Sequence, residues 1–100
     1  MSERKEKDKV LDVARTGNAY AIVQALNRYL KNALIKMHQV RRRLLAVKYY
    51  EAPAFNEIAV ELVLVNGLVL KVTMSYDRES GKIEHGWLSV SSLHTCACCE

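Results

Sequence analysis

Residues 58–76 read IAVELVLVNGLVLKVTMSY, and this stretch decides the fold. Apolar residues alternate with other residues on both sides of an Asn-Gly pair, which is typical of two β-strands joined by a tight turn. A two-residue turn would set the apolar face of one strand opposite the polar face of the other. A three-residue loop over residues 65–67 instead pairs Leu62 with Leu70 and gives Gly67 a left-handed conformation. We therefore predict a hairpin with a three-residue loop.

The same alternation predicts a further strand on each side of this hairpin. Before it, Leu45, Val47 and Tyr49 alternate with small or polar residues, so we expect them to face the core. After it, residues 83–93 form the last strand. Because the apolar parity changes within that strand, we predict a β-bulge at Gly86.

The segment before the strands has a helical pattern. Apolar residues recur at steps of three and four between Ala19 and Val40, and no Gly or Pro occurs from Asn18 to Ala52. This pattern predicts one helix from residue 18 to about residue 42, with Asn18 as its cap. We therefore expect an α+β fold in which one long amphipathic helix packs against a four-stranded antiparallel β-meander.

A chain of 100 residues has room for one domain. We expect residues 1–9 to be a flexible charged arm, residues 10–93 to be the α+β domain and residues 94–100 to be a cysteine-rich tail. The apolar residues between 10 and 14 fit either a helical turn or a strand. The charged start and the short apolar stretches indicate neither a signal peptide nor a membrane span, so we expect a cytoplasmic protein without membrane contact.

Charge is distributed unevenly along the chain. The net charge is +4, but residues 1–48 hold twelve basic and four acidic side chains, a net +8. Residues 49–100 hold three basic and seven acidic ones, a net −4. Such polarity indicates either a polyanionic partner, such as a nucleic acid or anionic lipid, or attraction of the two halves to each other or to a second subunit.

Catalysis has little support in the sequence. We find no nucleophile beside a recognisable base, and Ser80-Gly81-Lys82 lacks the remaining residues of a phosphate-binding loop. We therefore expect no enzymatic activity and no cofactor. The tail carries four weak candidates for metal ligands, and free thiols or disulfides between subunits are alternatives. These four residues are His94, Cys96, Cys98 and Cys99.

Basic and aromatic residues form the more coherent set. Single-stranded nucleic acid needs cations along its backbone and flat rings on which its bases stack. The predicted helix and the open face of the predicted sheet supply both kinds of side chain. The candidates are Tyr20, Arg28, Lys31, Lys36, Arg41, Arg42, Arg43, Lys48, Tyr50, Lys71 and Trp87.

One extended helix against a four-stranded antiparallel sheet, in a small basic chain, resembles the archaeal ThermoDBP-type single-stranded DNA-binding proteins, and in particular their short related proteins. The resemblance covers about residues 10–93 and depends on architecture, length and charge. It implies a homo-oligomer that binds single-stranded DNA largely independently of sequence. Two alternatives are an RNA-binding protein and a scaffold subunit whose polarised charge pairs with a partner chain.

Overall fold

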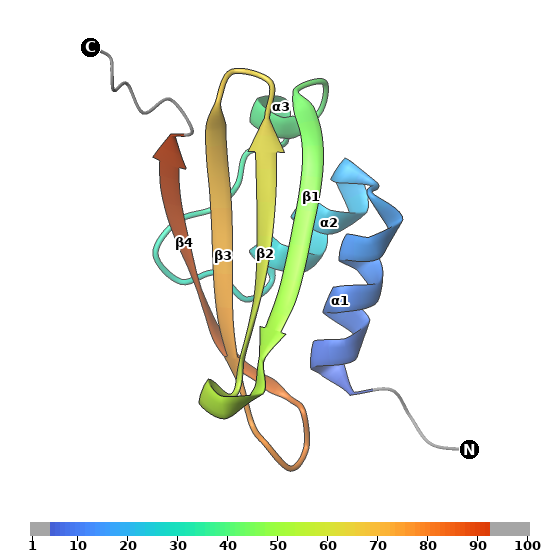
Figure 1. Ribbon diagram of the computed structural model, residues 1–100, viewed down its shortest axis with the longest axis vertical. Coiled ribbons are helices and arrows are strands. Elements are labelled where there is room, and N and C mark those ends of the chain that lie inside the picture. The colour runs from blue at the N-terminus through green and yellow to red at the C-terminus, as the bar shows by residue number, and fades with distance from the viewer. Residues whose placement is uncertain (1–4, 93–100) are drawn as a thin grey trace.

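The computed structural model describes residues 5–92 of the chain. Two helices come first, and a short helix then leads into four strands (Figure 1). The elements are α1 (Glu6–Thr16), α2 (Ala19–Asn27), α3 (Met37–Val40), β1 (Leu44–Ala52), the 3₁₀ turn η1 (Pro53–Phe55), β2 (Glu57–Leu64), β3 (Leu68–Tyr76) and β4 (Ile83–Ser92).

The four strands form one antiparallel sheet in the order β1-β2-β3-β4, so the predicted meander is confirmed. The predicted hairpin is confirmed as well. Leu62 lies opposite Leu70 and Val63 opposite Val69, which leaves residues 65–67 as the loop. Gly67 has a φ of +90°, a conformation that side chains other than glycine rarely adopt.

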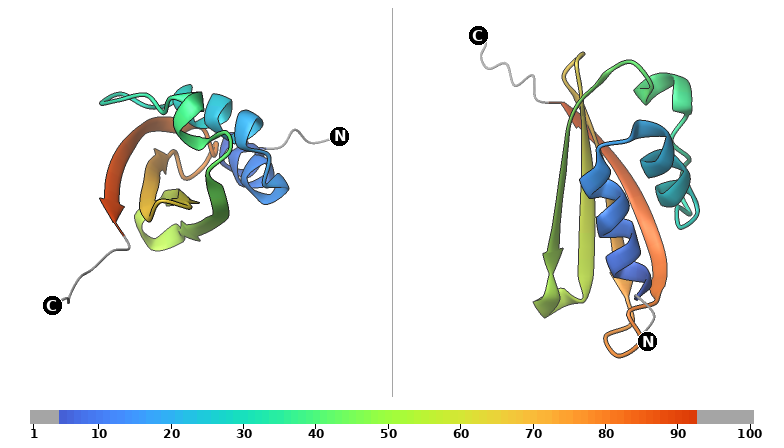
Figure 2. Two further views of the ribbon diagram at one scale, coloured as in Figure 1. Left: turned by 90° about the horizontal axis from the view of Figure 1, so that it is seen from above. Right: turned by 90° about the vertical axis from the view of Figure 1, so that its right-hand side faces the viewer.

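The alternation of β2 and β3 gives the sheet an inner face that packs on the helices. The helices lie on one side of a curved sheet (Figure 2). The inner face of β2 and β3 meets Ile22 and Leu26 of α2 in the core. Its side chains are Ile58, Val60, Leu62, Leu64, Leu70, Val72, Met74 and Tyr76. Burial of these apolar side chains is the main source of stability.

The prediction of one long helix is wrong. Asn18 caps α2 as expected, since its side chain accepts a hydrogen bond from the Ala21 amide at 3.1 Å. However, α2 ends at Asn27, whose side chain bonds both the amide and the carbonyl of Ile35, at 2.8 and 2.9 Å. Residues 28–36, which we call the connecting segment, therefore turn back instead of continuing the helix.

The connecting segment is held against β4. The side chain of Asn32 bonds both the amide and the carbonyl of Leu88, at 3.0 and 2.9 Å, and the Gly86 amide donates to the Tyr29 carbonyl at 2.9 Å. These bonds replace part of the backbone pairing that another strand would supply along this edge. The segment also buries Leu30 and Ile35, which compensates for the lost helical turns.

The predicted flexible arm over residues 1–9 is wrong for Glu6 to Lys9, which begin α1; residues 1–4 lie outside the described residues. Residues 10–14 are helical, and the apolar pair Val10 and Ala14 faces the core. The sequence pattern does not predict that these charged residues begin a packed helix, because the partners of Glu6 and Lys7, Ile83 and Glu51, lie far away in the sequence.

Three side chains hold α1 to the sheet. The Lys7 ammonium lies 3.0 Å from Glu51 Oε2, and the Tyr76 hydroxyl donates to the same oxygen at 2.6 Å. Lys7 Nζ also lies 5.1 Å from the centre of the Tyr76 ring. The hydrogen bond from Tyr76, together with Lys7, lowers the pKa of Glu51. We call these residues the Lys7–Glu51–Tyr76 cluster.

Two bulges adjust the edge strands. The bulge predicted at Gly86 is misplaced: Ser75 lies opposite His85 and Tyr76 opposite Ile83, so the extra residue is Glu84. A Cβ at Gly86 would be crowded, since it would lie 3.0 Å from Met74 Cγ and 3.1 Å from the Tyr29 carbonyl oxygen.

A bulge at the start of β1 leaves Leu45 exposed instead of facing the core. Of the other two residues expected to face inward in this strand, Val47 packs against the core. Tyr49 shares the inner face with Val60 opposite it but is 38% exposed.

Candidate nucleic-acid interface

The outer face of the sheet, opposite the helices, carries a row of two aromatic and two small side chains. Tyr50 lies opposite Ala59, Ala59 opposite Thr73, and Thr73 opposite Trp87. The two rings therefore stand on the edge strands β1 and β4, and the small side chains occupy the strands between them. Tyr50 is 44% exposed and Trp87 57% exposed. We call these four residues the aromatic row.

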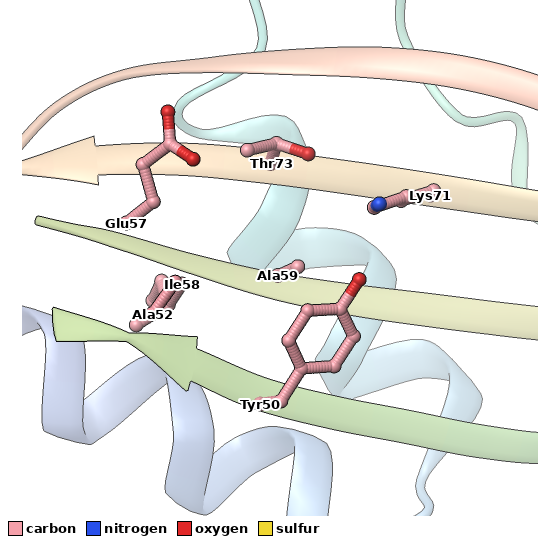
Figure 3. Close-up of a pocket in the computed structure, with 7 residues that line it drawn as sticks. All are labelled: Tyr50, Ala52, Glu57, Ile58, Ala59, Lys71 and Thr73. Atoms are coloured by element: carbon pink, nitrogen blue, oxygen red, sulfur yellow. The ribbon is translucent and has the colours of Figure 1, made fainter. Parts of the chain in front are cut away.

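A hollow of about 130 Å³ opens beside Tyr50 in this row. Figure 3 shows the Tyr50 ring on one side of the hollow, with Glu57, Thr73 and Lys71 along the other and Ala59 between them. The small side chain of Ala59 leaves this space open. A flat ligand can therefore contact a ring and polar groups at the same time.

Charged groups of opposite sign lie across from one another in the neighbouring row. Lys48 lies opposite Glu61, and Glu61 lies opposite Lys71. The Tyr50 hydroxyl donates to Glu61 Oε2 at 3.1 Å, and Lys71 Nζ lies 5.7 Å from the centre of the Tyr50 ring. Contact with the Tyr50 hydroxyl, supported by nearby carboxylates, raises the pKa of Lys71, so this group stays cationic.

A second cationic surface lies at one end of the sheet. Arg41, Arg42 and Arg43 are exposed and, with His38, line a hollow of about 250 Å³. Among residues 5–92, no carboxylate forms an ion pair with any of these arginines. The Arg43 carbonyl accepts from the Val65 amide at 2.7 Å, which fixes the arginines beside the β2–β3 loop. We call Arg41–Arg43 the basic end.

The candidate residues thus divide between two main surfaces. Lys48, Tyr50, Lys71 and Trp87 share the outer face. Tyr20 shares a hollow with Arg41 and so lies at the basic end. Strand β1 links the two surfaces, because it starts directly after Arg43 and reaches Lys48 after about 16 Å.

The remaining candidates line none of the hollows of these two surfaces. Arg28 lines a hollow between α1 and α2, Lys31 lies in the connecting segment beside β4, and Lys36 precedes α3. We expected the predicted long helix to carry Tyr20, Arg28, Lys31 and Arg42 together on the face opposite the core. That expectation is wrong, because the continuous helix that would align them does not exist.

Of the seven residues that line the hollow, sequence reasoning selected Tyr50 and Lys71 as site residues and missed Ala52, Glu57, Ile58, Ala59 and Thr73. The predicted β2–β3 register already placed Ala59 opposite Thr73 on the polar side of the hairpin. What was missing was the register of β1 and β4 against that hairpin, since only this register brings Tyr50 and Trp87 into the same row.

Within residues 5–92 no group of three or more His, Cys, Asp or Glu side chains is placed to bind a metal ion. The tail candidates His94, Cys96, Cys98 and Cys99 lie outside the described residues, so their role stays a prediction. In the same described range, no helix is long and apolar enough to cross a membrane.

Comparison with known proteins adds no assignment: no family model matches the chain, and no curated protein or solved structure matches it either. The resemblance to the ThermoDBP-type proteins stays a hypothesis. It now depends on the four-stranded sheet, the chain length and the charge, because the long helix is absent from the described residues.

Proposed function

We propose that this protein binds single-stranded nucleic acid on the outer face of its sheet, without catalysing a reaction. The aromatic row is the observation that carries the proposal, because it presents two exposed rings on either side of small side chains. Unpaired bases stack on such rings, whereas the paired bases of a duplex are already stacked on one another. DNA and RNA both meet this requirement.

The outer face and the basic end differ in charge, and we assign them different contacts with the nucleic acid. On the outer face Lys48 and Lys71 flank Glu61, so the face itself attracts phosphates only weakly. The basic end has no such compensation from the described residues. We therefore assign base stacking to the aromatic row and most of the phosphate contacts to Arg41–Arg43, with β1 as the path between them.

Fluorescence anisotropy with a labelled oligonucleotide of about 20 nucleotides tests the proposal. We expect binding at about 50 mM salt that weakens steeply by about 200 mM, since each phosphate contact contributes roughly −0.7 to the log–log slope for a single strand. RNA and DNA of one sequence, and the DNA duplex, form the comparison set. Absence of binding at low salt, or tighter binding to the duplex than to either strand, contradicts the proposal.

A second candidate is a protein–protein interface, favoured by exposed apolar side chains near the basic end. Leu45 is 67% and Val65 60% exposed, and both lie where β1 begins beside the β2–β3 loop. Exposed apolar residues that lie together are typical of contact surfaces. Sedimentation of the purified protein without nucleic acid tests this candidate: a dimer that Leu45→Ser dissociates supports it, and a monomer at high concentration rejects it.

A further inference from the structure

Glu57 is a carboxylate that the proposed stacking surface does not explain. It lines the hollow beside Tyr50 and is half-buried. Its side chain forms no hydrogen bond or ion pair with any residue in the range 5–92, whereas Glu61 on the same strand accepts from the Tyr50 hydroxyl. Glu57 attracts Lys71 electrostatically but accepts no hydrogen bond from the described residues, and such a half-buried carboxylate favours a ligand that donates hydrogen bonds.

The other groups that line the hollow supply a hydrogen-bond donor and a ring on which a ligand can stack. Lys71 carries a cationic donor on β3, and Thr73 of the same strand lies between Lys71 and Glu57, which stands on β2 (Figure 3). The Tyr50 ring faces these groups across Ala59. The hollow therefore offers a stacking surface, one strong acceptor and one strong donor in a small space.

Only one of the common bases fits all of these groups. Guanine presents two adjacent donors, N1–H and the N2 amino group, next to the acceptor O6. A carboxylate accepts both donors with its two oxygens, and an ammonium donates to O6. Thymine and uracil place a carbonyl on each side of their single donor. Cytosine and adenine place a ring acceptor beside their amino group. Each of these four bases therefore brings an acceptor against the Glu57 carboxylate.

We propose that the hollow beside Tyr50 is a guanine-selective subsite, in which Glu57 accepts from N1–H and N2, Lys71 donates to O6 and the ring stacks on Tyr50. This inference rests on the proposed function and adds a sequence preference to it. Binding then combines contacts that ignore sequence, at the basic end, with a preference at one nucleotide position.

The test uses thymidine oligonucleotides of about 12 nucleotides that carry a single central guanine, adenine, cytosine or inosine. With the full-length protein we expect the guanine strand to bind about tenfold more tightly than the all-thymidine strand. Inosine lacks the N2 amino group, so we expect most of this preference to disappear with it. Adenine and cytosine are expected to bind no more tightly than thymidine.

Glu57→Gln tests the assigned residue, and Glu79→Gln is the matched control, because Glu79 is an exposed carboxylate in the β3–β4 loop. We expect the ratio of guanine to thymidine affinity to fall to about one in Glu57→Gln and to stay near ten in Glu79→Gln. Circular dichroism verifies that both variants fold.

The possible failures are distinguishable. Equal affinity of the wild-type protein for all strands overturns the guanine subsite and leaves the proposed function standing. A guanine preference that survives in Glu57→Gln overturns the assignment of Glu57. If no strand binds at low salt, the proposed function and the subsite fall together.

Discussion

The two faces of the sheet arise from the same alternation along the same strands, yet they serve different purposes. On the inner face, side chains such as Val60 and Leu62 are fully buried against the helices. On the outer face, the row from Tyr50 to Trp87 keeps two large rings exposed over small residues. The proposed function assigns these exposed rings to binding, since aromatic side chains gathered on one face are typical of contact surfaces.

The largest expected effect tests the inner face. Leu62→Ala removes a fully buried side chain and leaves a cavity, so we expect it to lower the free energy of unfolding by about 2–5 kcal/mol. Urea denaturation measures the change. Val65→Ala is the control, since Val65 is an exposed loop residue, and a shift within about 0.5 kcal/mol is expected there. Equal losses in both variants would contradict the division between core and surface.

The next effect concerns the outer face. Trp87→Ala should weaken oligonucleotide binding by about 1–3 kcal/mol and leave stability nearly unchanged, because a base loses its stacking partner. Trp87→Phe keeps a ring and should retain most of the affinity. An affinity that stays the same in Trp87→Ala would remove Trp87 from the interface.

A smaller effect is expected at the Lys7–Glu51–Tyr76 cluster, which joins α1 to the sheet. The pKa of Glu51 is lowered in the folded protein, so its contribution to stability is present above the ordinary carboxyl value of 4.5 and is lost as the pH falls through the folded value. Glu51→Gln should cost about 1–2 kcal/mol at neutral pH and reduce the loss of stability on acidification.

Denaturation at a series of pH values measures this effect, with Glu79→Gln as the exposed control. If Glu51→Gln keeps the full acid dependence of the wild-type protein, the cluster does not stabilise the fold in the way that its hydrogen bonds indicate.

The smallest expected effect is on the salt dependence of oligonucleotide binding, and it tests whether the basic end or only the net charge of the protein attracts the strand. Arg42→Ala should reduce the salt slope of oligonucleotide binding by about 0.7, the value for one phosphate contact on a single strand. Arg78→Ala removes the same charge from an exposed position in the β3–β4 loop and should leave the slope unchanged. Equal changes in both variants would mean that net charge alone, and not the basic end, attracts the strand.

The sequence predicted the features that depend on neighbouring residues. Alternation on both sides of residues 65–67 was enough to place the β2–β3 loop and its register. The prediction of Asn18 as a helix cap also depended on nearby residues, since its side chain bonds the amide three residues further on. These predictions succeeded because period and turn chemistry act within a few residues.

The failures involve contacts between distant residues. Helical periodicity continued past Asn27, but Asn27 bonds Ile35 and Asn32 bonds Leu88, 56 residues away. The aromatic row needs the registers of all three strand pairs. The bulge at the start of β1 leaves no clear pattern in the sequence, and the parity change in β4 placed the second bulge at Gly86 instead of Glu84. Glu57 became a candidate only when the hollow around it was known.

The central claim is that unpaired bases stack on the outer face, and the chain carries its own probe for it, because Trp87 is its single tryptophan. Titration with a single-stranded oligonucleotide, followed by tryptophan emission, should show saturable quenching that follows the anisotropy midpoint and is reversed by salt. Saturated binding in anisotropy with unchanged Trp87 emission would place the nucleic acid elsewhere on the molecule and contradict the account.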